Sequence, residues 1–175
     1  MCSGKYERVG TVEIQLVKSA KLATIYGGSD EAGITNEVNI YLKGITANTI
    51  YGGSKTDGIV TTANIFLQSG TVIDVYGGGY GGTTTTANVT LDGITIDEIH
   101  GGSKNAGITT NTNVVLNTGK VTDVFGGGYD VGVTNAKVTQ NGATVTNIYG
   151  GNQGGTGNGG DTDNATVNIA GKTAN

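Results

Sequence analysis

Residues 38–53 read VNIYLKGITANTIYGG, and this stretch contains the features that recur along the chain. Its last three residues are an aromatic ring and two glycines. This triplet occurs six times, at intervals of 25, 25, 24, 25 and 24 residues. The rings belong to Tyr26, Tyr51, Tyr76, His100, Phe125 and Tyr149. A fixed period of this size is typical of a stack of similar structural units, each of which contacts its neighbours.

The first five residues of the stretch alternate between inward and outward positions of a half-buried strand. The same pattern begins at Val12, Val38, Ala63, Ala87, Thr112, Ala136 and Ala165. We expect its first, third and fifth residues to face a core and the other two to face outward. The second position holds a rank of amides, Asn39, Asn64, Asn88 and Asn113, which are expected to exchange hydrogen bonds between neighbouring units.

Glycines divide each unit further. Bends with a positive φ are expected after the first strand, at Gly44, Gly70, Gly93, Gly119 and Gly142. A second short strand then leads to the ring, past a corner with two outward residues such as Asn48 and Thr49. After the two glycines we expect a polar loop and a third short strand, for example over residues 34–36. The last strand is expected over residues 166–170.

These patterns predict an all-β fold without helices. The fold class is a single-stranded parallel β-helix (β-solenoid) of about six coils of 24–25 residues. We expect right-handed winding because right-handed parallel connections dominate. Residues 1–11 lack the repeat and are expected to form an N-terminal lead-in or cap, and residues 12–175 the β-solenoid repeat domain.

Composition agrees with a ladder of paired strands and excludes several function classes. The 175 residues include 33 glycines and no proline, which suits strands that must donate every backbone N–H. The net charge is −4 without a basic cluster, which argues against nucleic acid as a partner. Apolar runs are too short for membrane insertion. A single cysteine, Cys2, excludes an internal disulfide and a cysteine-ligated zinc site.

Units of the form V-N-I-x-L-x-G followed by I/V-Y-G-G-G/S resemble the glycine-rich YGG-type strand repeats of predicted cell-surface, adhesin-like proteins of gut Gram-positive bacteria. The resemblance covers residues 12–170. It implies an extracellular location at the bacterial cell surface and a structural or adhesive role, and it transfers no catalytic residue. His100 and Phe125 depart from it in the ring position, and Gln140 departs from it at a core position.

The expected function is therefore a non-enzymatic extracellular β-solenoid that acts as a structural or adhesive segment of a bacterial surface protein. A segment of a phage tail fibre or tailspike that binds host glycans is the alternative. A carbohydrate-binding or ice-binding solenoid is a further alternative. For ice binding, the relevant pattern is a mixed threonine column, Thr61, Thr85, Thr110 and Thr134, although threonine is also a common strand residue.

The candidate sites are few. The six rings are expected to form a structural aromatic ladder, in which His100 substitutes for a ring. Tyr41 and Phe66 on first strands and Tyr80 and Tyr129 in loops form a candidate surface for glycans or for another copy of the chain.

Catalytic residues and cofactors are not expected. Asp161 and Asp163 follow a glycine-rich loop and match a calcium-binding pattern weakly, so a solvated loop is favoured there. The acidic pair Asp97 and Glu98 is discounted as a pair of glycosidase carboxylates, because adjacent residues seldom face one cleft.

Overall fold

The computed structural model describes residues 8–17, 21–154 and 160–170. These residues form strands and no helix. The strands are β1 (Arg8–Val17), β2 (Lys21–Tyr26), β3 (Ile34–Tyr51), β4 (Ile59–Tyr76), β5 (Thr83–His100), β6 (Thr109–Phe125), β7 (Val133–Gln140), β8 (Thr144–Tyr149) and β9 (Thr162–Ile169). They stack in the order β1-β3-β4-β5-β6-β7-β9, while β2 pairs with β3 and β8 with β6, and every pairing is parallel.

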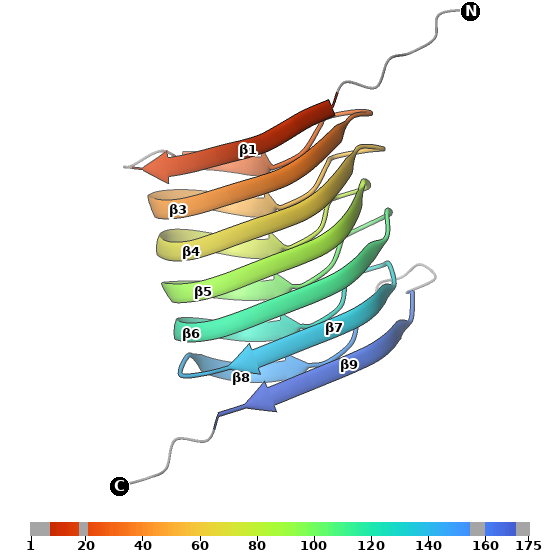
Figure 1. Cartoon of the computed structure of the whole chain (residues 1–175). Coiled ribbons are helices and arrows are strands. Elements are labelled where there is room, and N and C mark those ends of the chain that lie inside the picture. Colours follow the sequence, from red (N-terminus) through yellow and green to blue (C-terminus); the bar gives the residue numbers. More distant parts are fainter. Residues whose placement is uncertain (1–7, 18–20, 155–159, 171–175) are drawn as a thin grey trace, which may run out of the picture.

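The chain is a right-handed β-solenoid of about six coils, as the repeat predicts. In Figure 1 the near strands run to the left and the fainter, more distant strands run to the right, while the chain descends from β1 to β9. Residues one repeat apart pair in register, for example Ile40 with Ile65 and Tyr51 with Tyr76. Each coil therefore adds a layer about 4.8 Å thick to the stack.

Each central coil is one long strand bent into two legs. β3, β4 and β5 have 18 residues each, and the bends contain Gly44, Gly70 and Gly93, with φ of 80°, 121° and 124°. The prediction of positive φ is also confirmed at Gly119, but Gly142 lacks it, and the coil there splits into β7 and β8.

The predicted third strand is wrong, because residues 34–36 are the beginning of β3. Pairing to the neighbouring coil continues on both sides of Asn36, through Thr35 and Glu37. The residues between the loop and the bend at Gly44 contain no glycine, so nothing in this segment interrupts the ladder.

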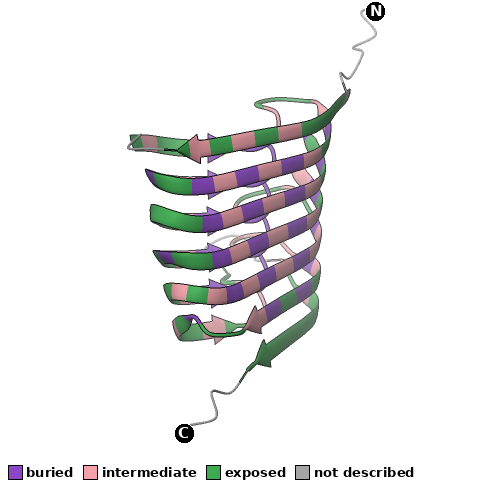
Figure 2. Ribbon diagram, turned by 60° about the vertical axis from the view of Figure 1, so that its left-hand side comes forward, coloured by how far each residue is buried: buried purple, intermediate pink, exposed green. Residues whose placement is uncertain are grey.

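The core lies between the two legs and consists of aliphatic columns. The predicted alternation is confirmed: in β3, Val38, Ile40 and Leu42 are fully buried, whereas Asn39 and Tyr41 are only half-buried. Figure 2 shows this alternation on the first legs of the central coils. Burying such columns is the largest favourable contribution to the stability of the stack, at roughly 25 cal/mol per Å² of apolar surface.

Outside the core, part of the predicted amide ladder is present. The Asn64 side chain donates to Asn39 and the Asn88 side chain donates to Asn64, both over 2.8 Å. Asn64 both donates to Asn39 and accepts from Asn88, so the two bonds tie three neighbouring coils together. A second amide column, not expected from the sequence, joins Asn135 to Asn111 at 2.9 Å.

The two legs converge where the ring–glycine–glycine triplet meets the start of the next first leg. A Cβ atom on Gly77 would lie 2.3 Å from the carbonyl oxygen of Gly101 and 3.0 Å from the Ala87 side chain. Gly52 is equally close to Gly77 and Ala63. The first glycine of the triplet is thus required by the close approach of two coils. The same close approach explains the small residues at this level of the first leg, such as Ala63 and Ala87.

The two ends of the stack differ from the expectation in detail. β1 begins at Arg8, so residues 8–11 of the expected lead-in belong to the first coil, and residues 1–7 lie outside the described residues. β9 begins at Thr162 rather than at residue 166. Figure 2 shows β9 exposed along its length, in contrast to the strands above it.

Candidate functional site

The six predicted ladder residues form one continuous stack of rings. From Tyr26 to Tyr149, successive ring centroids lie 4.6–5.0 Å apart, with 6–14° between ring planes. The imidazole of His100 continues the stack, 4.6 Å from Tyr76 and 4.9 Å from Phe125. Parallel in-register strands place every ring directly over the previous one, which explains the ladder.

The middle of this ladder is buried although it lies outside the aliphatic core. Tyr76 is 2% exposed and His100 is fully buried, whereas Tyr149 at the end of the stack is 47% exposed. Two loop tyrosines pack against the stack, Tyr80 on Tyr51 and Tyr129 on His100, each with ring centroids 5.8 Å apart in an edge-to-face arrangement. Burial raises the pKa of the Tyr51 and Tyr76 hydroxyls above their usual value. The middle of the ladder is therefore closed to solvent, whereas the two end rings, Tyr26 and Tyr149, are partly exposed.

A lysine and a carboxylate complete this cluster. Lys104 Nζ lies 5.1 Å from the Tyr76 ring centroid and 6.0 Å from that of Tyr129, so its charge faces both rings. His100 Nε2 lies 3.2 Å from Glu98 Oε2. Because an ionised carboxylate only accepts, the ring donates through Nε2. His100 Nδ1 is buried and has no hydrogen-bond partner among the described residues.

Glu98 belongs to a column of carboxylates that the sequence analysis did not recognise. Asp74, Glu98 and Asp123 pair in register on β4, β5 and β6, two residues before the rings. Burial and then the neighbouring Glu98 charge raise the pKa of Asp74. The hydrogen bond from His100 lowers the pKa of Glu98, against the opposing effect of burial. The two carboxylates thus have opposite effects on stability. A repeat alignment shows the column, but not which member His100 contacts.

Replacing Asp74 by asparagine is expected to stabilise the protein at neutral pH, by less than about 1 kcal/mol because the carboxyl remains partly solvated. A raised folded-state pKa means that the charged form of Asp74 destabilises the fold above that pKa. The gain from Asp74→Asn should therefore disappear as the pH falls below about 4, where the carboxyl is protonated in both states.

Glu98→Gln is the matched variant, and it is expected to change the free energy of unfolding in the opposite direction. Since the folded-state pKa of Glu98 is lowered, its stabilising effect is present above the unfolded pKa and is lost as the pH falls through the folded pKa. Chemical denaturation at a series of pH values measures both effects. A loss of stability at neutral pH for Asp74→Asn, or a gain for Glu98→Gln, would contradict this electrostatic description.

The four residues of the predicted ligand surface separate into two groups. Tyr80 and Tyr129 cover the buried ladder, as described above. Tyr41 and Phe66 stack on each other on the outer face of the first legs, with ring centroids 4.9 Å apart and 9° between planes. Beside Tyr41 lies a depression of about 210 Å³ lined by Glu13, Gln15, Val17, Tyr41 and Lys43. The polar residues around it were not recognised in the sequence, because they come from two different coils.

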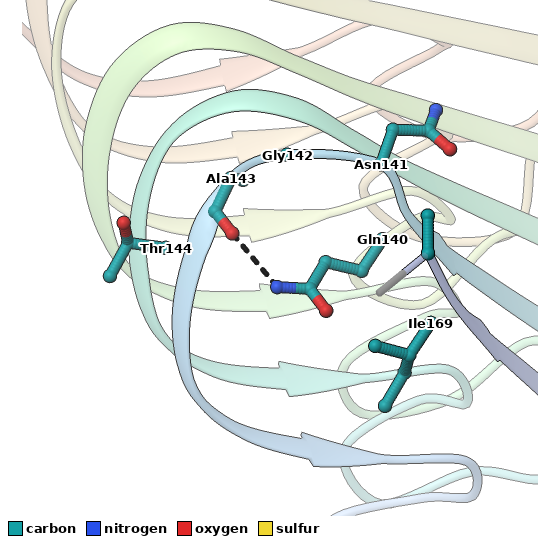
Figure 3. A pocket seen from close by; sticks show the side chains of 7 residues that line it. Gln140, Asn141, Gly142, Ala143, Thr144 and Ile169 are labelled. Atoms are coloured by element: carbon teal, nitrogen blue, oxygen red, sulfur yellow. Dashed lines mark hydrogen bonds between the residues drawn. The ribbon is translucent and has the colours of Figure 1, made fainter. Parts of the chain in front are cut away.

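A larger depression of about 330 Å³ lies at the C-terminal end of the stack (Figure 3). Ile169 and Gln140 line it, at the level that leucines occupy in earlier coils. Gln140, the predicted departure in the core, is half-buried, and its amide donates to the carbonyl oxygen of Ala143 over 2.9 Å. That bond satisfies the polar group where the coil splits into β7 and β8. Ile169 itself is 63% exposed.

The remaining candidates are at the surface. Asp161 and Asp163 are exposed beside a depression of about 250 Å³ that Ile108 and Val131 also line. In the part of the chain that the structure describes, no group of three His, Cys, Asp or Glu side chains is placed to hold a metal ion. Asp97 is exposed, whereas Glu98 contacts His100. The threonine column is uneven: Thr61 and Thr85 are exposed, whereas Thr110 and Thr134 are half-buried.

Comparisons with known proteins identify no relative of this chain. Searches of protein-family models, curated proteins and solved structures find no match to the chain. Among the described residues there is no helix of the length and apolarity that a membrane span requires.

Proposed function

We propose that this chain is a non-enzymatic, extracellular β-solenoid that acts as a structural and adhesive segment of a bacterial surface protein. The observation that carries the proposal is the stack of parallel coils, in which an aliphatic core and a six-ring ladder run side by side through about six coils. Such a stack holds its surface side chains at fixed spacings and so presents them rigidly.

Two features of the outer face support an adhesive role. The Tyr41–Phe66 pair lies on the outer face beside polar side chains that offer both hydrogen-bond donors and acceptors. Glycans or another copy of the chain are the partners that these surfaces suit.

Surface labelling tests the location. Antibodies raised against the recombinant chain should bind intact cells of the source bacterium, and brief protease treatment of these cells should remove the signal. Labelling only after permeabilisation would contradict the proposal. An antibody against a ribosomal protein serves as the control for cell integrity.

The oligomeric state distinguishes the surface-protein segment from the main alternative, a phage tail fibre or tailspike. Light scattering of the purified chain should show a monomer if it is a segment of a surface protein. A stable trimer would instead favour a phage tail fibre or tailspike, in which three solenoids pack side by side and bind host glycans.

A further inference from the structure

Tyr41 packs on a second ring on one side and lines the depression on the other side. The second ring is Phe66 of β4, and the two rings are nearly parallel. On the other side, towards β1, the residue in register with Tyr41 is Gln15, which continues the column without a ring. Three of the five residues that line the depression, Glu13, Gln15 and Val17, belong to β1. Tyr41 and Lys43 of β3 form the remaining wall of this depression.

The other walls supply a mixed set of polar groups. Glu13 offers a carboxylate, Lys43 an ammonium group, and Gln15 an amide that can both donate and accept. The Gln15 amide donates to the Glu13 carboxylate, which orients both groups. Because one acidic and one basic side chain face the same space, their charges balance. A neutral ligand with several hydroxyl groups suits these walls better than an ion does.

The volume of the depression and the Tyr41 ring in its wall determine which ligand fits. A depression of about 210 Å³ is smaller than the roughly 300–1,000 Å³ of sites for drug-sized molecules, so it accommodates one ring and not a chain of rings. The face of an aromatic ring is negative, and it attracts the weakly positive C–H groups on one face of a pyranose. The hydroxyls at the sugar edge would then meet Glu13, Gln15 and Lys43.

We propose that the depression between β1 and β3 binds a single neutral pyranose residue of a glycan, stacked on Tyr41 and held at its edge by Glu13, Gln15 and Lys43. This inference rests on the proposed adhesive function and specifies the ligand class. Phe66 supports the site from below, as a positioning residue that fixes the orientation of the Tyr41 ring.

Titration of the ¹⁵N-labelled full chain tests the proposal. The probes are methyl β-D-galactopyranoside, methyl β-D-glucopyranoside and methyl α-D-mannopyranoside. At least one of them should shift the amide signals of Gln15, Tyr41 and Lys43 in a saturable way, with a dissociation constant in the millimolar range. Tyr41→Ala should weaken this binding at least about tenfold, whereas Tyr41→Phe, which keeps the ring, should retain it within about twofold.

Two further variants keep the test decisive. Gln15→Trp fills the depression while it extends the stack of rings, so it should abolish binding in a folded protein. Tyr149→Ala removes an exposed tyrosine at the opposite end of the stack and should leave binding unchanged. Absence of saturable shifts with all three sugars, or equal binding by the wild type and Gln15→Trp, would overturn the site.

The failure of this site and the failure of the proposed function are distinguishable. If antibodies label intact cells but the chain binds none of the three sugars, the proposed sugar site is wrong and the proposed surface location still holds. If the chain binds a sugar but antibodies do not label intact cells, the sugar site is supported and the proposed surface location is wrong.

Discussion

Tyr76→Ala is expected to lower the free energy of unfolding by about 3–5 kcal/mol, the usual cost of removing a large buried ring. The Tyr76 ring is 2% exposed and lies between Tyr51 and His100, at centroid distances of 5.0 and 4.6 Å. The substitution removes the stacking on both sides and leaves a cavity under Lys104, whose ammonium group faces the ring. Coils on either side of this position lose a shared contact, so the effect extends along the stack.

Tyr149→Ala is the matched control within the same ladder. Among the described residues its ring stacks on Phe125 alone, and it is 47% exposed, so the expected loss is below about 1 kcal/mol. Urea denaturation followed by far-UV circular dichroism measures both variants. Similar losses for Tyr76→Ala and Tyr149→Ala would show that stacking and burial in the middle of the ladder contribute little to stability.

Gly77→Ala is the second substitution with a large expected effect, a loss of about 3 kcal/mol, at the upper end of what overpacking usually costs. The new methyl group would lie 2.3 Å from the Gly101 carbonyl oxygen, and both groups belong to backbones that are fixed by pairing to neighbouring coils. Neither can move without breaking hydrogen bonds such as the one from Gly77 N to His100 O, at 2.8 Å. The variant should therefore unfold at much lower denaturant concentration or fail to accumulate as a folded protein.

Gly10→Ala provides the control for this substitution. Gly10 also lies on a strand, but a Cβ atom built there meets no atom of the described residues within 4 Å. Its replacement should change stability by less than about 0.5 kcal/mol. Thermal unfolding of the two variants side by side would reveal the difference. If Gly77→Ala were as stable as Gly10→Ala, the close approach of the coils at the glycine pair would not constrain the fold.

The ladder and the core columns were predictable because a parallel stack translates each residue by one repeat. Tyr26 and Tyr51 share a repeat position, so the period alone brings their rings together. The separate third strand expected over residues 34–36 is wrong, because no glycine divides it from the segment that begins at Val38. The backbone has no reason to leave the ladder there, since pairing continues through Thr35 and Glu37.

The cluster around His100 and the depression beside Tyr41 could not be predicted from the sequence and became visible only in the structure. Lys104 occupies a variable loop, and its position over Tyr76 depends on the path of that loop, which no period specifies. Glu13 and Lys43 occupy different repeat positions in different coils and meet only across the surface. Repeat periodicity identifies residues that stack vertically, whereas such diagonal neighbours depend on side-chain directions and loop geometry.

The pairing of each coil only with the coils next to it has a mechanical consequence. A coil contributes about 4.8 Å to the length of the folded stack. Its 24–25 residues reach roughly 80–90 Å when fully extended, at about 3.3–3.6 Å per residue. Tension applied through the two ends detaches the outermost strands first and leaves the rest intact. The molecule would thus respond to load as an extensible tether, lengthening in steps of one coil while the remaining coils keep their shape.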